Sequence, residues 1–169
     1  MSTGEFVIRP ARTPDVSAVR RLVSLYTEDG RLLAKAPVTL YEDVQEFLIA
    51  EVDGRVVGCG ALHVMWEDLG EIRTLAVDPE HGRSGIGGRI LDELIDRARE
   101  LGLARLFCLT FEVDFFRSRG FDEIEGSPVD HAVFEQLLQS YDEGVAEFLD
   151  LERVKPNTLG NHRMLMLLR

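Results

Sequence analysis

The chain has 169 residues, a length that fits one domain with a single hydrophobic core. Its hydrophobic content of 45% and charged content of 29% are those of an ordinary globular protein, and no apolar run approaches the roughly 18 residues that a membrane span requires. The net charge of -11 argues against nucleic acid as a partner, because the surface at large would repel a phosphate backbone. Any anionic ligand must therefore bind at a local basic patch.

The termini and the cysteines indicate a single cytosolic domain, residues 1–169. The opening MSTGEF lacks the charged and then apolar pattern of a signal peptide, so we expect a cytoplasmic protein. Cys59 and Cys108 lie in apolar runs without a CxxC spacing, which favours buried, reduced thiols. The four histidines show no metal-ligand spacing, so no metal site is expected.

The first third of the chain predicts a strand, two helices and a second strand. EFVIRPA (5–11) is typical of a short edge strand, and Thr13 and Pro14 predict an N-cap followed by proline at the first helical position. A second helix is expected over LYEDVQEF (40–47), which leads into the strand FLIAEV (47–52). The first helix has an apolar stripe at helical spacing, formed by Val16, Val19, Leu22, Val23 and Tyr26.

The middle of the chain predicts an antiparallel meander of three strands. Asp53 and Gly54 tolerate positive φ and form a hairpin signal between FLIAEV and RVVGCGALHVMW (55–66). The tetrapeptide EDLG (67–70) predicts a further turn into EIRTLAV (71–77). The three strands should therefore be neighbours in one sheet.

The second half predicts alternating helices and strands. An amphipathic helix over 90–101 should stop at Gly102. The further expected elements are a strand at LARLFCLTF (103–111), a short helix at VDFFRSRG (113–120), a helix over 127–141 capped by Ser127, and closing strands at EFLDLERV (147–154) and HRMLMLL (162–168). This order predicts an α+β fold with a mixed sheet and helices on both faces.

Four glycines gather where EIRTLAV ends and the amphipathic helix begins: Gly82, Gly85, Gly87 and Gly88. The unpaired N–H groups of a first helical turn and the helix dipole together favour an anion, and Arg83 and Arg89 could add charge-assisted hydrogen bonds. The alternative is a tight strand-to-helix connection without a ligand. A dinucleotide fingerprint is set aside, because the spacing is GxGG and no parallel strand–helix–strand unit is expected around it.

The run LAVDPEHGRSGIGGRIL resembles the acetyl-CoA signature of the GNAT N-acetyltransferases. The resemblance implies a GNAT-like, largely antiparallel mixed sheet and acetyl-CoA as cosubstrate. Gly82 occupies the position that usually holds Gln or Arg, and Arg83 follows it. The pantetheine arm would lie along Leu75, Ala76 and Val77 as an added strand would. The pyrophosphate would bind at Gly82, Arg83, Ser84, Gly85, Ile86, Gly87 and Gly88.

Nearly the whole chain, roughly residues 5 to 169, is similar to stand-alone bacterial N-acetylglutamate synthases. The similarity rests on LLAKAPVTLYEDVQEFLIAEVDG, LGEIRTLAVDP, LARLFCLTFEVDFFRSRGF and VKPNTLGNHRMLML. It implies acetylation of the α-amino group of glutamate, the first step of arginine biosynthesis, and suggests a homodimer. The longer synthases carry a kinase-like domain that mediates arginine inhibition, for which this chain has no room.

Glu71 is the candidate general base. Alternation along the strand places Glu71, Arg73, Leu75 and Val77 on one face, and a glutamate at this strand position commonly acts as the base in the family. Freeing the lone pair of an amine that titrates about two units above the working pH costs about 2.7 kcal/mol. The alternative for Glu71 is a salt bridge with Arg73.

Many GNAT relatives protonate the leaving thiolate with a tyrosine, but the matching position here is Phe116. Phe115 and Phe116 are therefore expected to be wall and core residues, as the longer synthases also lack the tyrosine. Water, Thr110 or amides at a helix end remain as proton donors.

Substrate contacts rest on Lys35, Arg73, Thr74, Asn161 and Arg163. A glutamate carries two carboxylates and needs at least two cations or donor clusters. In the longer synthases a cation matching Lys35 binds the amino-acid carboxylate. The longer synthases also carry an R-x-S motif where this chain has Gly160, Asn161 and His162. This departure from the motif leaves glutamine or another amino acid open as a substrate. Solvated surface positions are the alternative for Lys35, Arg73 and Arg163. Two other classes stay open: a protein or peptide acetyltransferase, and an acetyl-CoA sensor without turnover.

Overall fold

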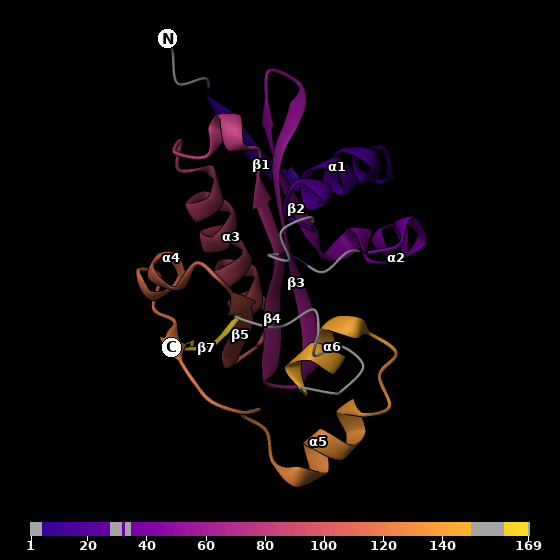
Figure 1. Ribbon diagram of the computed structural model, residues 1–169, viewed down its shortest axis with the longest axis vertical. Helices are drawn as coiled ribbons and strands as arrows, with labels where there is room; N and C mark the ends of the chain where they lie inside the picture. Colours follow the sequence, from indigo (N-terminus) through magenta and orange to yellow (C-terminus); the bar gives the residue numbers. More distant parts are fainter. Residues whose placement is uncertain (1–4, 28–31, 33–34, 150–160, 169) are drawn as a thin grey trace. The chain divides into compact units, whose positions relative to one another are not determined.

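A computed structural model of the chain describes residues 5–27, 32, 35–149 and 161–168. Their strands form a seven-stranded sheet in the order β1-β2-β3-β4-β5-β7-β6 (Figure 1). The pairs β1–β2, β2–β3, β5–β7 and β6–β7 are antiparallel, and β4–β5 is parallel. The predicted α+β class with a mixed, largely antiparallel sheet is confirmed.

The elements have the following bounds. The strands are β1 (Phe6–Pro10), β2 (Phe47–Val52), β3 (Arg55–Trp66), β4 (Leu69–Val77), β5 (Arg105–Thr110), β6 (Asp122–Glu123) and β7 (His162–Leu167). The α-helices are α1 (Val16–Thr27), α2 (Pro37–Glu42), α3 (Ile86–Leu101), α4 (Val113–Arg117), α5 (His131–Leu137) and α6 (Glu143–Phe148). The 3-10 helices are η1 (Thr13–Asp15), η2 (Val44–Glu46) and η3 (Pro79–His81).

The chain divides into two compact units, here called unit 1 (Met1–His63 and Ile72–Arg97) and unit 2 (Val64–Glu71 and Ala98–Arg169). The expectation of a single domain over 1–169 stays a prediction. Within the described residues, no helix has the length and the apolar character that crossing a membrane requires.

Unit 1 packs helices on opposite faces of its strands, as the alternation along β3 requires. Cys59 and Ala61 belong to the apolar cluster of α1, whereas Gly58 and Gly60 face the side chains of α3. Figure 1 shows α1 and α2 on one side of these strands and α3 on the other. The absence of side chains on Gly58 and Gly60 lets α3 approach β3 closely.

Unit 2 has its own apolar cluster, in which the ring edge of Phe107 on β5 meets Phe148 of α6 at 4.8 Å between centroids. The cluster also includes Met65, Leu69, Leu137, Val145 and Leu149. This cluster packs α5 and α6 against β5 and β7.

Three local expectations hold. Asp53 and Gly54 both adopt positive φ in the β2–β3 hairpin, at 50° and 79°. The helix α3 stops before Gly102, whose φ is 90°. Both cysteines are buried thiols, and burial raises the pKa of Cys59 to about 12.

Two expectations in the second half are wrong. Ser127 caps no helix: α5 begins after Asp130, which accepts from Val133 N, and the hydroxyl of Ser127 donates to Phe148 O at 2.7 Å. The start of EFLDLERV is the end of α6 rather than a strand, because the N-cap Asp142 starts a helix there. Residues 150–154 of that prediction lie outside the described part.

Three expectations in the first half need smaller corrections. Thr13 is the first residue of η1 and Arg12 is its N-cap. The second helix begins at Pro37, ahead of the predicted start, and β4 already begins at Leu69. The parallel pairing of β4 with β5 across α3 is a strand–helix–strand unit, contrary to the expectation, because α3 is the crossover that parallel strands require.

We expect Gly60→Ala to destabilise the fold by about 1 to 3 kcal/mol through overpacking. An added Cβ would lie 2.8 Å from Ile90 Cγ2, 3.0 Å from Leu75 Cδ1 and 3.1 Å from Leu94 Cδ1. Urea unfolding measures the loss of stability. Gly58→Ala is the matched variant, whose added Cβ would lie 3.0 Å from Ile86 Cγ2. Equal stability of Gly60→Ala and the wild type would contradict the close packing of α3.

Asp15→Asn tests the buried carboxylate at the end of η1. The Arg9 guanidinium donates to both oxygens of Asp15, at 2.8 and 3.0 Å, and Arg12 N donates to Oδ2 at 2.7 Å. These hydrogen bonds lower the pKa of Asp15 below 3.8. A lowered folded pKa contributes stability above the unfolded pKa, which is lost as the pH falls through the folded pKa. We expect the variant to lose on the order of 1 to 3 kcal/mol at pH 7 and the difference to shrink below about pH 4.

Urea unfolding at pH 7 and pH 3 measures this difference, with the exposed Asp122→Asn as control. A deficit that is the same at both pH values would show that the ion pair is not its source.

Candidate active site

The glycine-rich loop (residues 82–88) lies in unit 1 and runs from the end of η3 into the first turn of α3, which begins at Ile86. Its residues 82–85 are exposed, while Ile86 is buried beneath it at the helix start. The first N–H groups of the 16-residue α3 have no acceptor inside the helix, and the helix dipole adds positive potential at this end. The loop therefore has features that an anion site requires, and binding of an anion there stays a prediction.

Backbone geometry explains two of the glycines. Gly85 has φ 84° with open space around it, a conformation that a side chain would strain. A Cβ on Gly82 would lie 3.3 Å from Pro79 O, which is a tight contact. Arg83 is exposed, and Arg89 is mostly exposed beside Glu93 at 3.6 Å, so both cations can reach a bound anion.

The strand that precedes the loop contains a local irregularity. Thr74 adopts φ 57°, which is an outlier for a β-branched residue and indicates a strained position. The Cys59 thiol donates to the carbonyl oxygen of Thr74 at 3.4 Å and occupies the space beneath it. Beyond this point Leu75 approaches Gly60 and Ala76 joins the α1 cluster.

The junction from β4 to η3 is held by residues that the motifs did not reveal. The Tyr26 hydroxyl donates to Val77 O, and Arg21 Nη1 donates to Asp78 Oδ2 at 3.2 Å. Asp78 Oδ1 accepts from Glu80 N at 3.1 Å, and this bond and Arg21 lower the pKa of Asp78 below 3.8. An aspartate before proline is a local turn signal that could have identified Asp78, whereas Arg21 and Tyr26 are more than 50 positions away.

Glu71 lies in unit 2, at the last recorded pair of the parallel ladder, opposite Phe107. Its residue exposure is 5%, which is rare for a carboxylate. The neighbouring Cys108 is buried as well, and burial, with Glu71 as a second cause, raises the pKa of the Cys108 thiol well above 9.0. Glu71 is therefore a buried carboxylate close enough to Cys108 to act on its thiol, and buried carboxylates of this kind are candidates for proton transfer.

Arg163, on β7, is engaged inside unit 2. Its Nε donates to Gly126 O at 2.9 Å and its Nη1 to Glu147 O at 3.3 Å, while Nη2 donates to Phe148 O. The guanidinium also lies 4.9 Å from the ring centroid of Phe107. These contacts hold the ends of the α5–α6 segment, and a contact of Arg163 with substrate stays a prediction.

Asn161 precedes β7, and its Oδ1 is buried without a hydrogen-bond donor among the described residues. A buried acceptor of this kind costs free energy unless a ligand or water supplies a donor. The predicted substrate contact of Asn161 therefore agrees with its surroundings but is not tested by them.

The other predicted substrate residues lie in unit 1. Arg73 and Thr74 are buried on β4, with exposures of 8% and 7%, and Lys35 is half-buried two positions before α2. Phe116 is buried and meets Phe115 and Phe121 edge to face, so the expectation of a core role is confirmed. Among the described residues, no group of three His, Cys, Asp or Glu could hold a metal ion.

Comparisons with known proteins fit this geometry. The profile described as "Acetyltransferase (GNAT) family" matches residues 17–121. An amino-acid acetyltransferase of Mycobacterium tuberculosis is 59% identical over 166 residues, which cover 96% of this chain and 94% of that protein. The chain belongs to the GNAT family of acetyltransferases. The predicted acetyltransferase class and acetyl-CoA as its cosubstrate are confirmed.

Two solved structures are similar to this GNAT chain. A Mycobacterium tuberculosis protein in complex with CoA and NLQ has a TM-score of 0.94 and 58% identity, over 96% of this chain and 99% of that one. The N-acetylglutamate synthase of Neisseria gonorrhoeae, complexed with coenzyme A and N-acetyl-glutamate, has a TM-score of 0.78 and 29% identity. This chain matches 35% of the gonococcal protein's length, with 98% of its own residues covered.

We expect Gly85→Ala to weaken CoA binding about fivefold, because alanine at positive φ costs on the order of 1 kcal/mol and moves the loop amides. The matched control is Gly54→Ala, at φ 79° in the β2–β3 hairpin, where open space also surrounds the glycine. Calorimetric titration with CoA measures both variants. Equal affinity of Gly85→Ala and the wild type would remove the loop from the binding site.

Proposed function

We propose that this acetyltransferase transfers the acetyl group of acetyl-CoA to the α-amino group of L-glutamate and makes N-acetyl-L-glutamate in the cytosol, as the first step of arginine biosynthesis. The observation that carries the proposal is the buried carboxylate of Glu71 on the strand that leads to the glycine-rich loop. The likeness to an N-acetylglutamate synthase solved with coenzyme A and N-acetyl-glutamate supports the choice of substrate.

Glu71 acts as the general base in this proposal. The ammonium group of the amino acid must lose a proton before its lone pair can attack, which costs about 2.7 kcal/mol when its pKa is about two units above the pH. Glu71 takes that proton, directly or through a water molecule. The nitrogen then bonds to the thioester carbonyl carbon, the carbon–sulfur bond breaks, and CoA leaves as a thiolate that is protonated.

The loop and the end of β4 hold the cosubstrate. In this proposal the pyrophosphate accepts hydrogen bonds from N–H groups of residues 83 and 85–88, since Gly82 N and Ser84 N already donate to Pro79 O and His81 O, and Arg83 and Arg89 supply positive charge. The pantetheine arm pairs with the backbone of Leu75, Ala76 and Val77 as an added strand. This placement directs the thioester toward the part of β4 that carries Glu71.

Position 116 holds a buried phenylalanine, which has no hydroxyl to protonate the thiolate. Thr110 remains a candidate: its hydroxyl oxygen accepts from Glu112 N at 2.8 Å, which leaves the hydroxyl proton for another acceptor. Water is the alternative donor.

Glutamate brings two carboxylates to a protein with a net charge of -11, so local donors must bind them. In this proposal the amino acid is bound by Lys35, Arg73, Thr74, Asn161 and Arg163. Arg163 already donates to three backbone carbonyls, so a carboxylate can use only what remains of its donor capacity.

Glutamine is the second candidate substrate, and Asn161 favours it. The buried Oδ1 of Asn161 lacks a donor among the described residues, and a side-chain amide supplies an N–H where a carboxylate does not. A substrate that satisfies such an acceptor is preferred over one that leaves it unpaired.

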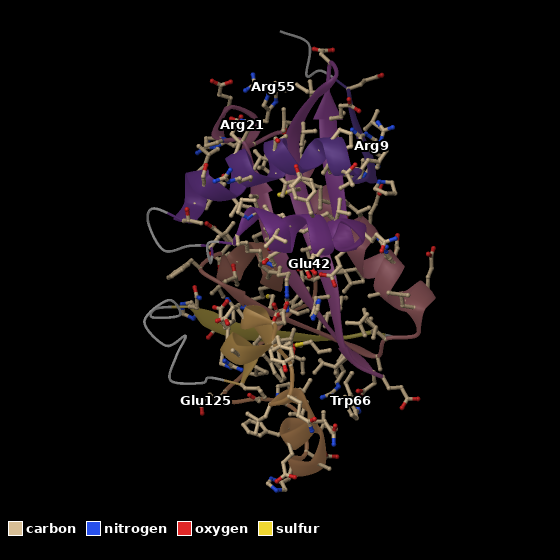
Figure 2. The ribbon with its side chains drawn as sticks, turned by 90° about the vertical axis from the view of Figure 1, so that its right-hand side faces the viewer. Arg9, Arg21, Glu42, Arg55, Trp66 and Glu125 are labelled. Atoms are coloured by element: carbon tan, nitrogen blue, oxygen red, sulfur yellow. The ribbon has the colours of Figure 1, made fainter. Side chains whose placement is uncertain are left out.

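We expect Glu71→Gln to lower kcat by at least about a hundredfold with little change in the KM for acetyl-CoA, because loss of a general base removes a transition-state contribution. A thiol-release assay with acetyl-CoA measures turnover across glutamate, glutamine, aspartate, lysine, ornithine and a short peptide. The matched control is Glu125→Gln, an exposed glutamate of unit 2 (Figure 2).

The substrate panel separates the candidates. Fastest turnover on glutamate supports the proposal, and fastest turnover on glutamine supports the second candidate. Turnover on the peptide alone would identify a protein acetyltransferase, and CoA binding without turnover would identify a sensor. A Glu71→Gln enzyme as fast as the wild type would end the catalytic role of Glu71.

A further inference from the structure

Two side chains of α1 reach the point where β4 ends. The Tyr26 hydroxyl donates to the carbonyl oxygen of Val77, the last residue of the strand. Arg21 Nη1 donates to Asp78 Oδ2 at 3.2 Å, and Arg21 Nη2 donates to Val56 O at 2.9 Å. Arg21 thus holds the side chain of Asp78, and Tyr26 holds the backbone carbonyl of Val77. These two residues are here called the α1 brace.

The two side chains of the Arg21–Asp78 ion pair are unequally exposed. The side chain of Arg21 is 38% exposed, whereas that of Asp78 is 10% exposed. A partly exposed ion pair contributes little to global stability, so the main effect of the contact is on local geometry. Arg21 also bonds β3 through Val56, and Asp78 N donates to Val57 O at 2.8 Å, which fixes Asp78 from two sides.

Charge at this end of unit 1 comes from a second arginine as well. Arg55, at the start of β3, acts on the Asp78 carboxylate through space. Figure 2 shows Arg21 and Arg55 at the same end of the unit. The carboxylate of Asp78 thus accepts a hydrogen bond from Arg21, and Arg55 adds to the lowering of its pKa.

Local hydrogen bonds lead from Asp78 to Ser84, in the first half of the glycine-rich loop. Asp78 Oδ1 accepts from Glu80 N at 3.1 Å and thereby starts η3. The series continues with His81 N to Asp78 O at 2.8 Å, Gly82 N to Pro79 O at 3.2 Å and Ser84 N to His81 O at 3.3 Å. The direction of the chain at Asp78 therefore affects the direction of the backbone up to Ser84.

We infer that Arg21 and Tyr26 are positioning residues for acetyl-CoA, which orient the end of β4 and the glycine-rich loop without touching the cosubstrate. The inference rests on the proposed placement of the pyrophosphate at the loop and of the pantetheine arm on β4. Fixed donors bind an anion better than donors that must be ordered on binding, because the ordering entropy is already spent.

The test compares Arg21→Met and Tyr26→Phe with two matched controls. Arg20→Met removes the same charge from the neighbouring exposed position of α1, and Tyr41→Phe removes a hydroxyl from an exposed tyrosine. Calorimetry measures the Kd for CoA, steady-state kinetics the KM for acetyl-CoA and for the amino acid, and urea unfolding the stability.

We expect the Kd for CoA and the KM for acetyl-CoA to rise about tenfold in each brace variant, as loss of a hydrogen bond to a charged or ordered group implies. The kcat at saturating acetyl-CoA and the KM for the amino acid should change less than about twofold, because the brace does not contact the acceptor. Arg21→Lys should restore part of the affinity, because lysine keeps the charge near Asp78 but cannot match the two-pronged geometry.

Other results would overturn the inference. Equal weakening in Arg20→Met would assign the effect to bulk charge, and a fall in stability with unchanged CoA affinity would assign a purely structural role. Binding of CoA does not require turnover, so the brace is testable even if the proposed substrate is wrong. A wild-type protein that did not bind CoA would refute both the placement and the brace.

Discussion

The close approach of α3 to β3 is the contact on which the candidate site depends. Ile86, Ile90 and Leu94 of α3 pack onto the bare backbone of Gly58 and Gly60. Because protein interiors are densely packed, this contact leaves little freedom in the position of the first turn of α3. The amides in the first turn of α3 are therefore placed by apolar packing, whereas the turn from Asp78 to Ser84 that precedes them is held by hydrogen bonds.

The same unit resolves an electrostatic conflict. A chain with a net charge of -11 repels anions at long range, and yet acetyl-CoA is strongly anionic. Backbone N–H groups and a helix dipole act over a few ångströms, where distant carboxylates are screened. Arg83, Arg89, Arg21 and Arg55 gather on elements that flank the loop, so the local field can differ in sign from the net charge.

Strain and burial occur together along β4. Glu71 and Arg73 are buried ionisable residues, and Thr74 follows them in a left-handed conformation that the Cys59 thiol supports through its carbonyl. Groups of this kind cost stability and are retained where a site requires them. The short stretch from Glu71 to Asp78 thus combines a buried carboxylate, a strained residue and a braced strand end within one element and its turn.

The amino-acid sequence by itself determined the features that depend on neighbours along the chain. Hydrophobic alternation predicted β3, β4 and β5, the Asp53 and Gly54 pair predicted the hairpin, and Gly102 predicted the end of α3, because each depends on local backbone preferences. The glycine spacing after LAV indicated an anion site, and its resemblance to the GNAT signature implied acetyl-CoA. Tertiary structure decided what depends on contacts between distant residues. It set the parallel pairing of β4 with β5 and the capping of α5 by Asp130 instead of Ser127. It also set the engagement of Arg163 with the ends of the α5–α6 segment and the bracing of Asp78 and Val77 by α1. No local pattern records which of many arginines or tyrosines meets a given carbonyl, since that choice is made only when the elements pack.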